Sequence, residues 1–304
     1  MTETHTLKNT AQQKVARLDK VDSRPAKNRA LKRFLKHRVA IAAVIVLTII
    51  TIISVGAPLF APFEYDKIDL RAAGLGPSPD HWFGTDRVGR DIWSRTLYGG
   101  RVSLAVGVGA TVIATSIGTV LGAISGFYRG WIDTLIMRIT DTVMTFPSIV
   151  IMLTLAALLP RSIWNIVLII GGLSWPSVAR LVRAQFMSIR ENEYVMAARC
   201  LGVRDRSIIV YHILPNVFAP LVALITFSVG SAILTEAGLS FLGLGVPPPM
   251  PSWGNMLESA RNLDILQNLP WMWIPPAMMT VITVLCVNFI GDGIRDAIDP
   301  RLVL

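Results

Sequence analysis

Six long tracts without a charged residue dominate this chain. They cover residues 39–63, 102–128, 142–160, 162–179, 207–235 and 265–291, and none contains Asp, Glu, Lys or Arg. Each tract is near or above the roughly 20 apolar residues that a helix needs to cross a bilayer. The composition, 52% hydrophobic and 16% charged, lies well outside that of soluble globular proteins. The sequence therefore predicts an all-α integral membrane protein with six transmembrane helices.

These tracts also set the expected boundaries. Residues 1–38 form a basic N-terminal tail, of which 1–30 are polar, aperiodic and predicted to be disordered. Residues 39–304 form one domain with spans at about 39–60, 102–128, 139–160, 162–183, 217–244 and 271–291. We end the fifth span near residue 244 because the proline-rich run at 246–251 cannot lie against lipid. Segments 61–101 and 245–270 then lie on one side of the membrane, and the polar loop 190–216 lies on the other.

The distribution of Lys and Arg predicts the orientation. Twenty-one of these residues lie in the tail, the 129–138 turn, the 180–206 region and the C-terminus, whereas eight lie in 61–101, at 161 and at 261. Basic residues concentrate on the cytoplasmic side. We therefore expect both termini and the 190–216 loop in the cytoplasm of a multi-pass protein. The net charge of +9 is explained by this orientation and by attraction to anionic lipid headgroups, without nucleic acid.

Motifs of catalysis are absent from the sequence. It contains no Gly-x-x-x-x-Gly-Lys-Ser/Thr phosphate loop, no His-Glu-x-x-His and no Gly-x-Ser-x-Gly. The four histidines have no metal-ligand spacing, and Cys200 and Cys286 support neither a disulfide nor a metal site. We predict a non-catalytic chain with no metal and no cofactor of its own.

The polar loop has the pattern of two short helices. Tyr194, Ala198 and Leu201 recur at positions i, i+4 and i+7, which predicts one face of a helix. Gly202 follows the last of them, as expected for a left-handed residue that ends a helix.

A second helix is expected to begin at Asp205 or Ser207 and to end at Pro215. Ala197 and Ala198 offer a small, closely approachable surface that suits insertion into a groove on a partner. An amphipathic loop lying on the inner leaflet is the alternative.

Few ionisable residues lie within the apolar tracts. Glu236 lies in the outer half of the fifth span, where it either faces a substrate path or reaches water. Asp141 is expected to pair with Arg138 across one helical turn. Pro147 and Pro176 are expected to kink the third and fourth spans, which either shapes a pore or eases packing.

The segment 80–101 interleaves aromatic and charged residues. This pattern suits an amphipathic piece at the outer headgroup boundary, in contact with another protein or acting only as a membrane anchor. The candidate interface residues are Trp82, Asp86, Arg90, Asp91 and Arg95.

Several segments of the sequence resemble a known family. YVMAARCLG at 194–202 with ILP at 213–215 is similar to the Glu-Ala-Ala loop of ABC importer permeases, although Met196 stands where that name would put glutamate. Further segments resemble the second permease subunit of dipeptide, oligopeptide and nickel importers: HWFGTD at 81–86, GRD at 89–91, SR at 94–95, GRVSL at 100–104, LSFLGLG at 239–245, SWG at 252–254 and NFIGDGIRDAIDP at 288–300.

The resemblance implies a fold, partners and a site. It implies the type I importer permease architecture in a bacterial inner membrane, with a second permease, two ATPase subunits that bind ATP and Mg, and an extracytoplasmic solute-binding protein. The loop would couple to an ATPase through Tyr194, Ala197, Ala198, Leu201, Gly202, Asp205, Leu214 and Pro215.

The resemblance leaves the cargo open. Di- or oligopeptides are the expected cargo, with nickel chelates or glutathione as alternatives within the family. An ion-coupled carrier, the alternative of another class, would require inverted repeats and paired ionisable groups at mid-membrane. Neither is apparent in the sequence.

Overall fold

The computed structural model describes residues 31 and 33–298. Within these residues the chain is helical and contains no strand; an isolated bridge joins Thr85 and Asp91. The predicted disorder of residues 1–30 and the end of the 288–300 motif fall outside the described residues.

Within the described residues, five helices are long and apolar enough to cross a membrane. They are α3 (Arg38–Val55), α5 (Ile92–Tyr128), α8 (Ile163–Ile189), α14 (Ile274–Ile298) and a helix over 205–241 that comprises α10 (Asp205–Ser207), the π-helix η2 (Ile208–Ile213) and α11 (Leu214–Phe241). A sixth candidate is the pair α6 (Gly130–Thr145) and α7 (Ser148–Leu158).

The third expected span is therefore not one straight helix. Helices α6 and α7 meet at an angle of 79°. Pro147 precedes the first residue of α7 and has φ −59° and ψ 109°, because the residue before a helix is free of helical geometry and proline fixes φ near −65°. Pro176 instead lies inside α8, where it is buried.

Helix α5 begins well before the expected second span. The carboxylate of Asp91 accepts a hydrogen bond from the Ser94 backbone N–H at 2.7 Å and caps the helix at Ile92. The charged residues Arg95 and Arg101 therefore lie in the first turns of α5 and not in a separate surface segment.

Short helices complete both ends of the molecule. At one end are α9 (Glu193–Cys200) and α10. At the other end are α4 (Ala57–Phe60), η1 (Leu70–Ala72), α12 (Trp253–Glu258), η3 (Ser259–Arg261), α13 (Leu263–Asn268) and η4 (Pro270–Met272).

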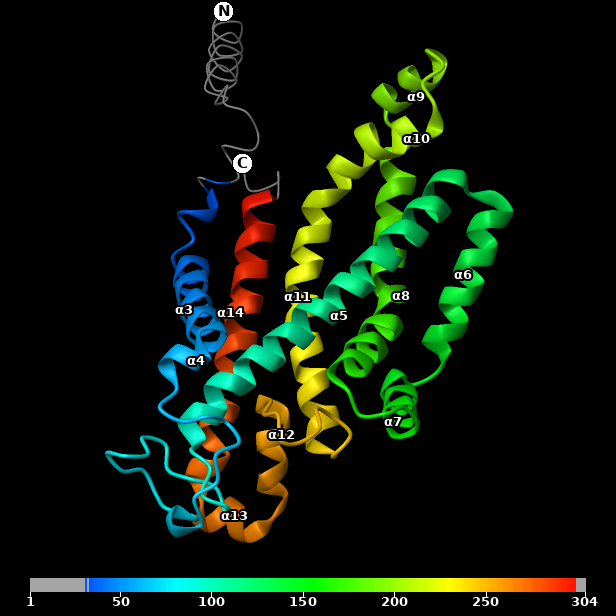
Figure 1. The fold of residues 1–304 in the computed structure, drawn as a ribbon. Helices are drawn as coiled ribbons and strands as arrows, with labels where there is room; N and C mark the ends of the chain where they lie inside the picture. Colours follow the sequence, from blue (N-terminus) through cyan, green and yellow to red (C-terminus); the bar gives the residue numbers. More distant parts are fainter. Residues whose placement is uncertain (1–30, 32, 299–304) are drawn as a thin grey trace, which may run out of the picture.

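Close helix packing forms the centre of the fold. Glycines at 118, 122 and 126 place one face of α5 directly on α8. A Cβ on Gly122 would lie 2.5 Å from the Ala179 carbonyl oxygen. Small residues at such spacing let two membrane helices approach closely. Figure 1 shows α5 crossing the molecule obliquely, with α3 and α14 towards one side and α6 to α8 towards the other.

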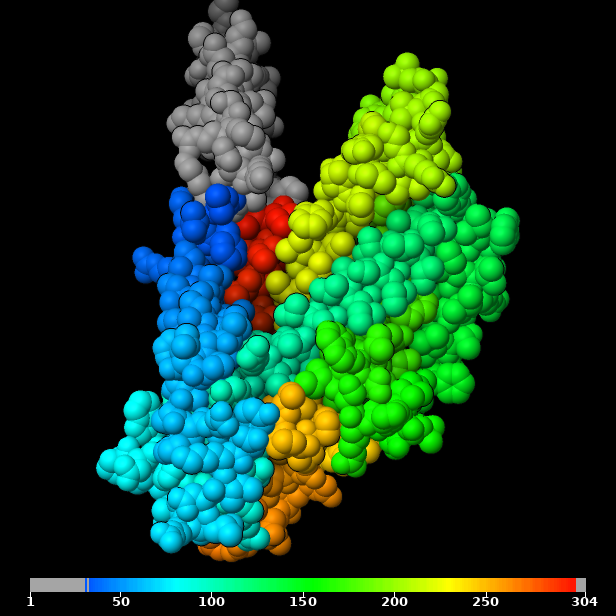
Figure 2. Space-filling view, viewed as in Figure 1, coloured from blue at the N-terminus to red at the C-terminus, as the bar shows by residue number. Residues whose placement is uncertain are grey.

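The two ends of the molecule differ in shape. The start of α3, the end of α14 and the α9 loop lie at the same end (Figure 1), and α9 with α10 projects beyond the neighbouring helices in Figure 2. The segment 61–91 folds together with α12 and α13 at the opposite end. The fold thus presents a projecting loop at one end and a folded cap at the other.

Candidate functional site

The loop at 193–215 ends its first helix as the sequence predicts. Gly202 has φ +76°. Its N–H donates to the Arg199 carbonyl at 2.9 Å, and the Val203 N–H donates to the Ala198 carbonyl at 3.1 Å. This pair of bonds satisfies helix carbonyls that would otherwise lack partners, and it requires a left-handed residue at 202. Glycine takes that conformation without steric cost.

The buried face of α9 differs from the predicted stripe. Val195 is fully buried and Ala198 nearly so, and both pack in a cluster with Phe186. Tyr194 is 44% exposed and Leu201 82% exposed. The predicted common face of Tyr194, Ala198 and Leu201 was therefore wrong, because Val195 and Ala198 together face the helices beneath.

The second half of the loop continues into α11 without a break. The expected end at Pro215 was wrong, since Pro215 lies near the start of α11, directly after the π-helix η2. Asp205 is the first residue of α10, whose preceding residue Arg204 makes no side-chain cap. Asn216 donates from Nδ2 to the Tyr194 hydroxyl at 3.2 Å and so links the two arms.

The coupling candidates divide into two residues that are wholly or partly buried and an exposed set. Ala198 is buried and Leu214 half-buried. The others are exposed and form the outer surface of the loop: Tyr194, Ala197, Leu201, Gly202, Asp205 and Pro215. Leu201, 82% exposed at the tip of the loop, is open to a contact with another protein.

Charged contacts join α8, the helix that leads into the loop, to α6. The Arg183 guanidinium binds the Asp133 carboxylate through two hydrogen bonds, of 2.6 and 2.7 Å, and ties α8 to α6. Arg180 pairs with Asp141 at 2.6 Å. The expected pair between Asp141 and Arg138 was therefore wrong, because Asp141 faces α8. These contacts fix α8, which precedes the loop in the chain, against α6.

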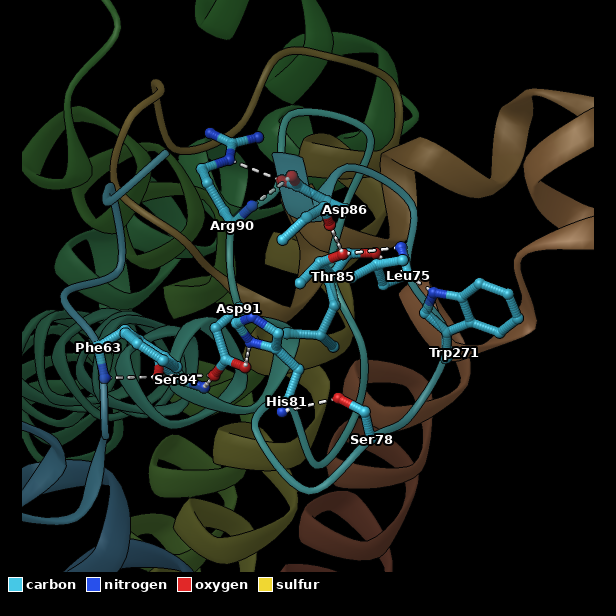
Figure 3. A network of polar contacts seen from close by, with 12 residues as sticks. Phe63, Leu75, Ser78, His81, Thr85, Asp86, Arg90, Asp91, Ser94 and Trp271 are labelled. Atoms are coloured by element: carbon cyan, nitrogen blue, oxygen red, sulfur yellow. Dashed lines mark hydrogen bonds and ion pairs between the residues drawn. The ribbon is translucent and has the colours of Figure 1, made fainter. Parts of the chain in front are cut away.

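The motif at 81–95 folds into one polar network, shown in Figure 3. The His81 imidazole lies 2.9 Å from Asp91 Oδ1, and the Asp91 carboxylate accepts from the N–H and the hydroxyl of Ser94, each at 2.7 Å. The Phe63 N–H donates to the same hydroxyl at 3.3 Å. Asp91 therefore joins the 61–91 segment to the start of α5.

Thr85 and Asp86 hold the next turn of this network. The Leu75 N–H donates to the Thr85 hydroxyl at 2.9 Å, and the Trp271 indole N–H donates to the Thr85 carbonyl at 3.2 Å. Asp86 accepts from the backbone N–H of Arg90 at 2.9 Å and from its Nε at 2.6 Å. These contacts fix the loop against the segment that precedes α14.

The network places most outer interface candidates inside the chain. Asp86, Asp91 and Arg95 are 5%, 3% and 8% exposed, and Arg95 donates to the Tyr65 carbonyl at 2.9 Å. Trp82 is 62% exposed. Of the five candidates, Trp82 is the one that presents a large surface to a partner or to lipid.

Glu236 lies in a second buried network and not in a water-filled path. Its side chain is fully buried and accepts from the hydroxyls of Ser103, Ser240 and Ser252, at 3.0, 2.7 and 2.8 Å. The backbone N–H of Trp253 donates to the Ser103 hydroxyl at 3.1 Å. Glu236 therefore fixes α12 against α5 and α11, and its partners were missed because Ser103 is distant in the sequence.

A cavity of about 300 Å³ lies between α5, α7, α8 and α11. Its walls contain no ionisable side chain, and neither Glu236 nor the two prolines line it. Each of these three residues is instead next in sequence to a residue that does: Glu236 follows Thr235, whereas Pro147 precedes Ser148 and Pro176 precedes Ser177. The lining hydroxyls are those of Thr111, Ser148, Ser174, Ser177, Ser228, Ser231 and Thr235.

The hydroxyls of this cavity are mainly free to accept hydrogen bonds. Ser174 donates to the Ile170 carbonyl at 2.7 Å, and Ser228 to the Leu224 carbonyl at 2.9 Å. A hydroxyl that donates within its own helix keeps its lone pairs for an N–H donor. The sequence carried a signal for this wall, because 228, 231 and 235 recur at helical spacing within an apolar tract.

Comparison with known proteins agrees with this geometry. The family described as "Binding-protein-dependent transport system inner membrane component" matches residues 118–304. The family described as "N-terminal TM domain of oligopeptide transport permease C" matches residues 28–77.

Three relatives illustrate the similarity. The chain is 47% identical over 276 residues, 91% of each chain, to a protein of Brucella suis named as a peptide permease. It is 43% identical to the dipeptide transport system permease protein of Alkalihalophilus pseudofirmus, over 90% of this chain and 89% of the relative. It is 39% identical to the glutathione transport system permease protein of Pectobacterium atrosepticum, over 89% and 90%.

Proposed function

Because this chain belongs to the family of binding-protein-dependent transport system inner membrane components, we propose that it forms half of the membrane pore of an ATP-driven importer of di- or oligopeptides. The other half is a second permease subunit. Two ATPase subunits supply the energy on the cytoplasmic side, where ATP and Mg bind to them and not to this chain, and a solute-binding protein delivers the substrate from the other side.

The projecting loop carries this proposal. Tyr194, Leu201 and Gly202 are exposed at the tip, whereas Val195 and Ala198 anchor α9 in the core cluster that includes residues of α5, α8 and α11. A force applied to the exposed face is therefore transmitted to the helices that line the membrane cavity. Closure of the ATPase subunits would move these helices as a body and switch the access of the pore.

The chain itself acts as a mechanical and binding component, without catalysis. The loop end is placed in the cytoplasm with both termini, and the 61–91 cap faces the opposite side, as the distribution of basic residues predicts.

The hydroxyl-lined cavity supports a peptide as cargo. Its neutral walls present acceptor oxygens of Ser174 and Ser228, which pair with the N–H groups shared by all peptides. Such walls recognise the backbone and tolerate different side chains. The names of the peptide and dipeptide permease relatives support the same cargo.

An ion-coupled carrier is a weaker account of the structure. A relay requires ionisable partners within the membrane, whereas Glu236 is hydrogen-bonded to three serine hydroxyls. Glutathione is the second candidate cargo, because a glutathione permease is 39% identical to the chain.

Reconstitution tests the proposed function. The four-subunit assembly in liposomes, supplied with its binding protein and with ATP on the ATPase side, should take up a labelled tripeptide. Glutathione and a nickel chelate in excess should compete less well than an unlabelled peptide. Uptake that follows an ion gradient without ATP would contradict the proposal, and stronger competition by glutathione would reassign the cargo.

A further inference from the structure

A second and larger cavity lies at the capped end of the molecule. Its volume is about 780 Å³, and its walls come from the start of α5 and Arg90 before it, from Arg161 two residues before α8, from the end of α11 and from the segment 243–265. Four guanidinium groups line it, whereas Glu258 is the one carboxylate among its lining residues. The guanidinium groups belong to Arg90, Arg95, Arg161 and Arg261.

The carboxylates of the chain neutralise only part of this charge. Arg90 is paired with Asp86 at 2.6 Å. Arg261 Nη1 lies 3.8 Å from Glu258 Oε1, too far for a hydrogen bond. Arg161 makes no ion pair or hydrogen bond with any residue that the structure describes. The cavity therefore has more positive groups than carboxylates to pair with them.

Most neutral polar side chains of the cavity are already engaged; the Asn262 amide oxygen accepts from the Asp264 N–H at 3.0 Å, and its nitrogen donates to no described residue. Ser240 donates to Glu236 at 2.7 Å, and Ser259 donates to the Met256 carbonyl at 2.7 Å. Asn255 donates to the Met250 carbonyl at 2.8 Å. The guanidinium groups of Arg161 and Arg261 thus remain as the principal free donors.

Size and shape favour a small ligand over the surface of a protein. Small-molecule sites commonly occupy about 300 to 1,000 Å³, and this cavity falls within that range. Arg95 is only 8% exposed, so a flat protein surface would not reach it, whereas Arg161 and Arg261 are exposed and open to an incoming ligand. Guanidinium groups bind carboxylates through paired, charge-assisted hydrogen bonds.

Resting on the proposed function, we propose that this cavity receives the terminal carboxylate of an incoming peptide, with Arg161 and Arg261 as its ligands. Arg161 lies just before the N-terminus of α8, where the partial positive charge of the helix adds to the attraction. The cavity would hold the peptide between its release from the binding protein and its entry into the membrane.

Peptide pairs test this proposal in the complete importer. The substrates are one tripeptide as its free acid and as its C-terminal amide, each first shown to load the binding protein. In the double variant R161Q/R261Q, uptake of the free acid should fall about tenfold or more, as expected for the loss of charge-assisted hydrogen bonds. Uptake of the amide should change little. R101Q is the matched control, because Arg101 is exposed on the same side and lines a different groove.

The outcomes separate the cavity from the overall function. If the double variant slows both peptides equally, the arginines bind the binding protein and the proposal fails. If it slows neither, the cavity has no part in transport. If the wild-type importer takes up neither peptide, the proposed function fails instead.

A labelling measurement tests the cavity without the binding protein. Asn262, which lines the cavity, is replaced by cysteine in the complex that carries Cys200→Ser; Cys286 is buried and stays. An anionic methanethiosulfonate should react faster than a cationic one of similar size. This preference should fall severalfold with R161Q/R261Q, and the free-acid peptide should slow labelling more than its amide does. An unchanged preference would overturn the proposal.

Discussion

The two ends of this molecule use their sequence motifs in opposite ways. At the capped end, the motif residues Asp86 and Asp91 are buried and bind other parts of the same chain. At the loop end, Leu201 and Gly202 are exposed, and a Cβ at Gly202 would meet no atom of the described chain within 4 Å. The motif residues at the capped end thus stabilise the fold through internal hydrogen bonds, whereas those at the loop end are exposed and available for contact with a partner.

The two ends also differ in how they treat buried carboxylates. A buried carboxylate is costly unless it is hydrogen-bonded, and Asp91 and Glu236 each have several donors. The loop carries no comparable network at its tip. Substitutions at the capped end should therefore affect folding first, and substitutions at the loop tip should affect coupling first.

The largest expected effect is that of Asp91→Ala. It removes the cap of α5 and leaves Ser94 and His81 without their acceptor. We expect a loss of about 3 kcal/mol or more in stability, measured as a lower unfolding temperature of the detergent-purified chain. Asp80→Ala is the control, because Asp80 is exposed. Equal effects of the two substitutions would contradict the structural role of the motif.

Glu236 should show a smaller and graded effect. Glu236→Ala leaves three serine hydroxyls without an acceptor and should cost about 2 kcal/mol. Glu236→Gln keeps the shape and one acceptor oxygen, so most stability and uptake should remain. Loss of uptake in a well-folded Glu236→Gln importer would show that ionisation of this residue is required and would favour an ion-coupled mechanism.

The smallest effect on stability is expected at Leu201. Its side chain is 82% exposed. Leu201→Ser should therefore change the free energy of unfolding of the isolated chain by less than about 0.5 kcal/mol, and the unfolding temperature should hardly shift. Peptide-stimulated ATP hydrolysis by the assembly should nevertheless fall strongly. A variant with normal coupling would show that the apolar tip is not part of the contact.

The sequence predicted the elements that depend on local chemistry. The apolar tracts predicted the membrane helices, and Gly202 predicted the end of α9, because hydropathy and left-handed backbone are properties of single segments. The break between α6 and α7 was not predicted, since proline within an apolar tract is compatible with either a kink or a break.

Contacts between distant segments could not be predicted. The partners of Glu236 include Ser103, and those of Asp141 include Arg180, both far away in the sequence. The early start of α5 was also missed because it depends on a contact with a distant segment. Arg95 is polar by type, but its burial depends on the carbonyl of Tyr65 in another segment. The cavities likewise depend on several helices at once.

Docking of the loop onto an ATPase subunit is the central claim, and Gly202→Arg tests it most directly. Gly74 provides the matched control, because it also has positive φ and open space around its missing Cβ but lies in the cap. Both substitutions carry a similar backbone strain. After purification of the assembly in mild detergent, Gly74→Arg should retain the ATPase subunits and their activity, and Gly202→Arg should lose one or both. Equal retention and activity in the two variants would contradict the claim.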